Sequence, residues 1–137
     1  YNNGWTLASL LPVKTTSLVT PRADSLISLD SQGSKKAFKL GSETATGEWD
    51  DYIKGITTVL RQQGFQISGA DIKISGADVQ ISSNIPLGSG LSSSAALVTS
   101  VLKGLRGAYH LQITDLHIAL MGQKVEHFVG ANTGLLD

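Results

Sequence analysis

Cysteine is absent from this 137-residue chain, and that absence excludes several kinds of chemistry. Without cysteine there are no disulfides, no thiolate nucleophile and no cysteine-based zinc site. The lack of cysteine also fits a reducing compartment, and we expect a cytoplasmic protein. Histidine is scarce too, and no pair has the H-x-x-x-H spacing of a zinc-binding helix; the histidines are His110, His117 and His127.

An excess of charge of one sign is missing as well, because 11 Lys and Arg balance 11 Asp and Glu. A chain without net charge has no global field that attracts nucleic acid or an anionic membrane. No apolar run approaches the roughly 20 residues that cross a bilayer. We therefore expect neither a nucleic-acid-binding nor a membrane protein. A hydrophobic fraction of 41% is enough for the core of one domain.

Strand-like patterns occupy the first part of the chain. Residues Val13 to Thr20 and Ser25 to Ser31 alternate between apolar and polar side chains, which predicts two strands. A weaker third strand is predicted from Lys36 to Leu40. The period becomes helical from Trp49, and Gly64 stands where that helix should end.

A short repeat follows this helix. The unit ISGAD occurs at Ile67 to Asp71 and again at Ile74 to Asp78. The β-type runs Asp71 to Ser75 and Asp78 to Ser82 are separated by a turn-prone Gly-Ala-Asp, which predicts a hairpin. Two copies are too few for a solenoid, so the repeat indicates a local duplication.

Glycine and serine gather in one stretch, PLGSGLSSSAAL, from Pro86 to Leu97. It lies between a strand that ends near Ile85 and a helix that starts near Ser92. The helix is predicted from an apolar stripe formed by Leu97, Val101, Leu102, Leu105 and Ala108. The order of elements is therefore strand, glycine-rich turn and helix.

Two uses of this stretch are open on local grounds. The first turn of a helix carries unpaired N–H groups and the positive end of the helix dipole, so the stretch can hold a phosphate. It has neither the lysine of a Walker A loop nor the third glycine of G-x-G-x-x-G. Serine is also a favoured N-cap, and capping is the more common use of such a turn.

The remaining chemistry depends on acidic residues near a further helix. Thr114 is a good N-cap, and the helix that it starts carries Leu116, Ala119, Leu120 and Phe128. Glu126 lies on this helix and Asp137 follows a turn. One carboxylate and a serine hydroxyl can hold Mg²⁺ beside a triphosphate, and a second carboxylate can orient an attacking hydroxyl. Otherwise Glu126 is on a solvated helix face and Asp137 is an ordinary turn residue.

The serine-rich stretch resembles a known motif. PLGSGLSSSAAL matches P-x-x-x-G-L-x-S-S-A-A, the second signature motif of the GHMP kinases, a superfamily of small-molecule kinases. Three further stretches resemble the galactokinases within that superfamily. They are YNNGW followed by LPVKTT, the helix GEWDDYIKGI, and MGQKVEHFVGANTGLLD.

The resemblance implies an α/β fold of the α+β type, a mixed β-sheet with helices packed on one face. Residues 1–137 would form part of the N-terminal, ATP-phosphate-binding domain of a two-domain kinase. The sugar-binding segment would precede Tyr1, and the C-terminal domain would follow Asp137. We therefore expect the chain alone to be inactive, because phosphoryl transfer needs groups from all these parts.

The resemblance also implies residue roles for a reaction in which ATP and Mg²⁺ phosphorylate galactose at its C1 hydroxyl. Asp137 would be the catalytic carboxylate, Ser94 and Glu126 would bind Mg²⁺, and Ser31 would lie near the nucleotide. The ATP phosphates would be wrapped by Gly88, Ser89, Gly90, Leu91, Ser92, Ser93 and Ser94.

Two departures from the family pattern affect these roles. One residue separates Glu126 from Phe128 where galactokinases usually have two, and on a helix one deletion turns the following residues by about 100°. Val98 stands where the family usually has Glu.

Other functions remain open. A non-catalytic galactokinase-like sensor of ATP and sugar would keep the same residues. Another GHMP kinase could act on N-acetylgalactosamine or arabinose, and a plain interaction module could use the fold without a nucleotide.

Overall fold

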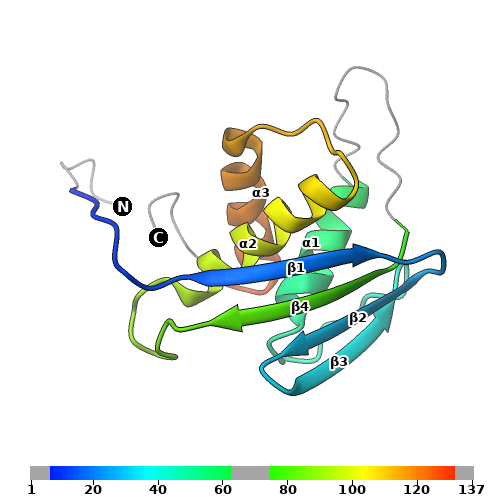
Figure 1. The fold of residues 1–137 in the computed structure, drawn as a ribbon, viewed down its shortest axis with the longest axis horizontal. Coiled ribbons are helices and arrows are strands. Elements are labelled where there is room, and N and C mark those ends of the chain that lie inside the picture. Colours follow the sequence, from blue (N-terminus) through cyan, green and yellow to red (C-terminus); the bar gives the residue numbers. More distant parts are fainter. Residues whose placement is uncertain (1–6, 63–74, 132–137) are drawn as a thin grey trace.

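The structure is a computed structural model that describes residues 7–62 and 75–131 (Figure 1). The strands are β1 (Thr15–Pro21), β2 (Leu26–Ser31), β3 (Ser34–Lys39) and β4 (Ala77–Ser83). The helices are α1 (Asp51–Gln62), α2 (Ser93–Ala108) and α3 (Asp115–Phe128). All the predicted strands and helices within these residues are present, with boundaries shifted by no more than two residues.

The four strands form one mixed sheet in the order β1-β4-β2-β3. Strand β4 pairs antiparallel with β1 and parallel with β2, so it lies inside the sheet. Strands β2 and β3 form a hairpin whose turn, Gln32 and Gly33, has positive φ at both positions, as tight hairpins require. The mixed sheet predicted by the family resemblance is therefore confirmed.

The hairpin predicted within the ISGAD repeat is wrong for its second run. Residues Ala77 to Ser83 pair with β1 along their whole length, and Ala77 to Ile81 also pair with β2. Both edges of β4 are therefore occupied by strands from earlier in the chain. Local sequence cannot predict this pairing of β4, because the partners of a strand depend on the whole sheet. Residues 71–74 of the first run lie outside the described residues, as does Gly64.

The three helices cover one face of the sheet (Figure 1). Alternate side chains of β2 and β4 point into the core beneath them, which is why Ile27, Leu29, Val79 and Ile81 are buried. Helix α2 contributes Val98, Val101, Leu102 and Leu105 to the same core. Val98 is fully buried, so the valine that departs from the family pattern is a core residue.

Two glycines allow the layers to approach closely. A Cβ at Gly104 of α2 would lie 2.6 Å from Cγ2 of Val19 on β1. A Cβ at Gly55 of α1 would lie 3.0 Å from Phe128 and Val125 of α3. Helix α2 therefore packs directly beneath β1, and α3 packs against α1.

Helix α3 differs from its sequence-based description in the face that it buries. Its buried apolar residues are Ile118, Met121 and Val125. The exposed ones include Leu116, Leu120 and Phe128, which the sequence singled out. The helix continues without a break from Glu126 to Phe128, so the missing family residue leaves a regular helix. Among the described residues, no helix has the length and apolarity to span a membrane.

Candidate functional site

The loop between β4 and α2 has an unusual backbone. The φ angle is positive at Gly88 (68°), Gly90 (71°) and Ser92 (53°), but not at Ser89 or Leu91. Positive φ at every second residue is typical of a nest, in which successive N–H groups turn toward one side and can bind an anion. Glycine adopts these angles without strain, whereas Ser92 does so at a cost.

Ser92 is the N-cap residue of α2 by position, yet it does not act as a cap. Its side chain makes no capping hydrogen bond, and the first turn of α2 contains no acidic residue. The nearby Ser89 hydroxyl donates to the carbonyl of Pro86 at 2.7 Å instead. Capping is therefore the wrong interpretation of this serine, and no Ser92 side chain competes for the N–H groups of the α2 start.

A cavity of about 400 Å³ adjoins the start of α2. Ser93 and Ser94 line it from α2, and Ser31 lines it from the end of β2. The aromatic side chains of Trp49 and Tyr52 line it from the start of α1, and the indole Nε1 of Trp49 donates to Ser34 Oγ at 3.2 Å. The cavity, called the aromatic pocket below, therefore joins flat apolar surfaces to serine hydroxyls.

The aromatic pocket contains residues to which sequence reasoning gave no role. From the sequence alone, Trp49 is only the first residue of the helical period and, with Tyr52, part of the GEWDDYIKGI stretch. The two residues are at i, i+3 spacing, but Trp49 lies two residues before α1 begins at Asp51. Aromatic residues at that spacing are usually core residues, so the sequence alone does not mark them as a binding surface.

A second hollow lies on the other side of the α2 start. Its volume is about 610 Å³, and it is lined by Gly90, Leu91 and Ser92 together with Leu11 and Lys103. The glycine-rich loop and the first turn of α2 therefore stand between two hollows. A ligand on the loop could extend into either one.

The predicted acidic residues either do not line the aromatic pocket or lie outside the described residues. Glu126 is on α3, is only 2% exposed and is not among the residues that line the pocket. Asp137 lies outside the described residues. Over residues 7–62 and 75–131, no three His, Cys, Asp or Glu side chains are grouped as a metal site would require. The structure thus brings Ser31, Ser93 and Ser94 together.

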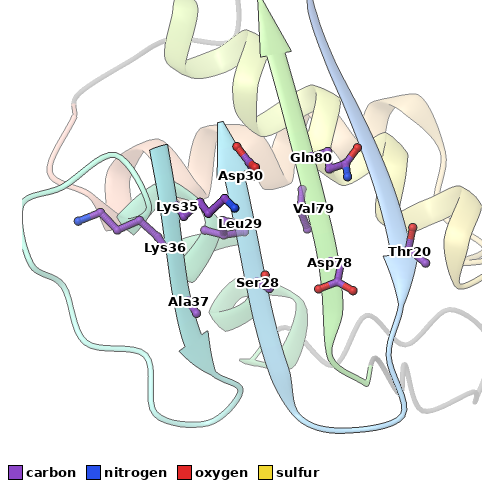
Figure 2. A pocket seen from close by; sticks show the side chains of 10 residues that line it. All are labelled: Thr20, Ser28, Leu29, Asp30, Lys35, Lys36, Ala37, Asp78, Val79 and Gln80. Atoms are coloured by element: carbon purple, nitrogen blue, oxygen red, sulfur yellow. The ribbon is translucent and has the colours of Figure 1, made fainter. Parts of the chain in front are cut away.

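A different depression lies on the sheet face that no helix covers (Figure 2). Its carboxylates already have partners within the protein. Asp78 binds Arg22 Nη1 at 2.9 Å, and Asp30 accepts the N–H of Gly33 at 2.9 Å. Its other lining residues include Lys35, Lys36 and Gln80, and no aromatic side chain lines it. We therefore place the candidate site at the glycine-rich loop.

Buried carboxylates hold the start of α1, next to the aromatic pocket. Burial acts to raise the pKa of Asp51, but hydrogen bonds from Lys54, Gly47 and Thr46 outweigh it and lower this pKa to about 2. Burial likewise opposes ionisation of Glu43, and contacts that include Arg61 hold the pKa of Glu43 at about 2. The loop before α1 is therefore fixed by carboxylates that stay ionised near neutral pH.

A comparison with protein families identifies one match. The family model described as "GHMP kinases N terminal domain" matches residues 51–137, which include α1, β4, the glycine-rich loop, α2 and α3.

Individual relatives point to the same group. The chain is 40% identical over 104 residues to the galactokinase of Pyrococcus furiosus, covering 75% of this chain and 28% of that protein. The structure superimposes on Lactococcus lactis galactokinase complexed with galactose with a TM-score of 0.80 at 30% identity. That match covers 92% of this chain and 33% of the other. The chain thus spans about a third of the length of these relatives.

A more distant match shows the fold alone. Methanococcus jannaschii mevalonate kinase superimposes with a TM-score of 0.67 at 21% identity, over 90% of this chain and 39% of that one.

Proposed function

The chain belongs to the GHMP kinase family, through its N-terminal domain, and on that premise we propose that it is the ATP-phosphate-binding part of a galactokinase. The reaction is the transfer of the γ-phosphoryl group of ATP to the C1 hydroxyl of galactose. Similarity to the galactokinases of P. furiosus and L. lactis supports this choice of sugar. The observation that carries the proposal is the nest formed at Gly88, Gly90 and Ser92 beside an uncapped helix start.

The nest is the phosphate-binding surface in this proposal. Backbone N–H groups of the loop and of the α2 start donate to phosphate oxygens, and the helix dipole favours their negative charge. A Cβ at Gly88 or Gly90 would meet no atom within 4 Å, so the space beside both glycines is open to a ligand. The base of the nucleotide occupies the aromatic pocket, between the surfaces of Trp49 and Tyr52.

Ser94 and Glu126 are the proposed Mg²⁺ ligands. Ser94 faces the aromatic pocket, where its hydroxyl is next to the proposed phosphate position. Glu126 is buried on α3, and similarity to the galactokinases supports its assignment as the acidic ligand. A bound Mg²⁺ would neutralise charge on the phosphate oxygens during transfer.

Asp137 is the proposed catalytic carboxylate, and Ser31 contacts the nucleotide from the end of β2. Asp137 would orient the C1 hydroxyl of the sugar and accept its proton. We propose that residues 1–137 alone bind nucleotide but do not transfer phosphate, because they span about a third of the galactokinases they resemble.

Calorimetric titration of the chain with Mg-ATP tests the binding step. We expect saturable binding, and we expect Ser94→Ala to weaken it at least tenfold while Ser28→Ala, on β2, leaves it unchanged. Ser28→Ala is the control because Ser28 lines the depression on the uncovered sheet face and neither of the two hollows beside the α2 start. Equal binding by both variants would contradict the proposed phosphate site.

ADP release by the protein encoded by the complete gene tests the reaction. Galactose should support turnover, and N-acetylgalactosamine and arabinose should not. Turnover with one of those sugars instead would identify another GHMP sugar kinase. Nucleotide and galactose binding without turnover would identify a non-catalytic sensor.

A further inference from the structure

The two aromatic residues of the pocket are separated by two aspartates that bind the same ammonium group. Lys54 Nζ lies 2.8 Å from Asp50 Oδ2 and 2.8 Å from Asp51 Oδ1. All three side chains are only 6 to 8% exposed. One lysine therefore holds both residues that connect Trp49 to Tyr52.

The same cluster ties this turn to the loop before it. Asp51 accepts the N–H of Thr46 at 2.8 Å and the N–H of Gly47 at 2.7 Å. Lys54 Nζ also lies 3.3 Å from Thr46 Oγ1. The turn is thus fixed by residues that do not themselves line the pocket.

The cluster stabilises the turn at a high desolvation cost. It buries two carboxylates against one ammonium, and desolvation of such groups offsets much of their attraction. Within the part of the chain that the structure describes, Asp50 Oδ1 is buried without a hydrogen-bond partner. Costly local arrangements of this kind are expected where a functional geometry must be held.

We propose that Lys54 is a positioning residue for nucleotide recognition. By binding Asp50 and Asp51, it fixes the turn that orients the rings of Trp49 and Tyr52. Fixed rings bind the base and so distinguish a nucleoside triphosphate from an inorganic triphosphate. This inference rests on the proposed function, because it assumes that the aromatic pocket receives the base.

The test needs a variant that removes the ammonium without leaving charge behind. Lys54→Met alone leaves two buried carboxylates unpaired, so the decisive variant is Asp50→Asn/Asp51→Asn/Lys54→Met, which buries no charge at these positions. The control is Asp115→Asn, which removes the exposed ion pair of Asp115 with Arg106 at 2.7 Å. That pair lies at the start of α3, and neither residue lines the aromatic pocket.

The first measurement reports the turn without any nucleotide. Trp5 and Trp49 are the two tryptophans of the chain, so Trp5→Phe leaves Trp49 as the single tryptophan, which is excited at a wavelength where tyrosine does not absorb. In that background we expect the triple variant to raise the acrylamide quenching constant of Trp49 at least twofold and to lower its anisotropy. The control should leave both values unchanged. An unchanged Trp49 in the triple variant would overturn the positioning role.

The second measurement compares Mg-ATP with Mg-tripolyphosphate as ligands. We expect the triple variant to bind Mg-ATP at least tenfold more weakly and Mg-tripolyphosphate within twofold of the unsubstituted chain. Equal weakening for both ligands, or for neither, would overturn the selectivity role. An unsubstituted chain that binds neither ligand would overturn the proposed function, and the fluorescence result would still decide whether Lys54 positions Trp49.

Discussion

Helices α2 and α3 both begin after a hydroxyl residue, but the two residues act differently. Thr114 caps α3 fully, because its hydroxyl accepts the N–H of His117 and the His117 ring accepts the N–H of Thr114. Ser92 at the start of α2 is left-handed and caps nothing with its side chain. At the start of α3 a side chain accepts a backbone N–H of the helix, whereas at the start of α2 the N-cap side chain accepts none.

The start of α1 is held in a different way, by buried ionic contacts and by hydrogen bonds to the loop before it. The carboxylate of Asp51 in its first turn binds Lys54 and the backbone of Thr46 and Gly47. Of the two helix starts that follow a hydroxyl residue, α3 has a side-chain cap and α2, after the glycine-rich loop, has none. On the proposed function, the N–H groups at the α2 start are available to phosphate oxygens.

The largest effect should come from the buried ion pairs at the start of α1. Lys54→Met leaves two buried carboxylates without their cation, so we expect the free energy of unfolding to fall by about 3 to 5 kcal/mol. Urea unfolding followed by circular dichroism measures the change. The exposed pair Arg106–Asp115 gives the control, since Asp115→Asn should cost no more than about 1 kcal/mol. A similar cost for both variants would show that the α1 start is an ordinary surface contact.

The second largest effect is expected from low pH, which should remove the stability contributed by carboxylates at the start of α1. The pKa of Asp51 is lowered from 3.8 to about 2, and that of Glu43 from 4.5 to about 2, because both carboxylates are held by cations and N–H groups. A lowered pKa contributes stability above the ordinary value, and this contribution is lost as pH falls through 4.5 and 3.8 toward about 2.

Urea midpoints measured from pH 6 to pH 2 check this prediction. The double variant Asp51→Asn/Glu43→Gln should show a smaller fall of the urea midpoint as pH decreases, because it removes both carboxylates. An unchanged fall of the midpoint would contradict the assigned contacts. The α2 start should contribute nothing to this fall, since its first turn carries no acidic residue.

Matched alanine substitutions compare the α3 and α2 starts directly. Thr114→Ala should lower the free energy of unfolding by about 1 kcal/mol, the usual cost of losing an N-cap. Ser92→Ala should change it by less than about 0.5 kcal/mol, because no capping bond is lost. Thermal or urea unfolding of the two variants measures both changes in the free energy of unfolding. If Ser92→Ala cost as much as Thr114→Ala, the α2 start would be capped in solution.

A small gain in stability is expected from Ser92→Gly. The φ of Ser92 is 53°, a value that glycine adopts freely, so the substitution should raise the free energy of unfolding by up to about 1 kcal/mol. Mg-ATP binding should change little, because backbone N–H groups make the nest. A loss of stability would show that the serine hydroxyl has a structural role after all.

Much of the fold could be predicted from the sequence, because its signals are local. Alternation along Ser25 to Ser31 marks β2, and the apolar stripe through Val101 and Leu105 marks α2. The hairpin at ISGAD could not be excluded locally, since only the complete sheet shows that β4 has strands on both sides.

The site was less predictable, for physical reasons that differ between residues. The phosphate loop carries its own motif, but whether Ser92 caps depends on its φ angle, which serine does not dictate. Trp49 and Tyr52 read as core residues, and their role depends on the cavity that β2, β4 and α2 form beside them. On α3, sequence reasoning singled out Leu116 and Leu120, whereas the helix buries residues such as Ile118.

The position of β4 has a consequence for folding. When β1 and the β2–β3 hairpin have been synthesised, they cannot yet be joined, because β4 lies between them and comes some 40 residues later in the chain. A sheet completed by its last strand depends on long-range contacts, which form slowly. The glycine-rich loop follows β4 directly, so its nest can take shape only at the end of this process. Nucleotide binding would then report complete folding of the sheet during synthesis.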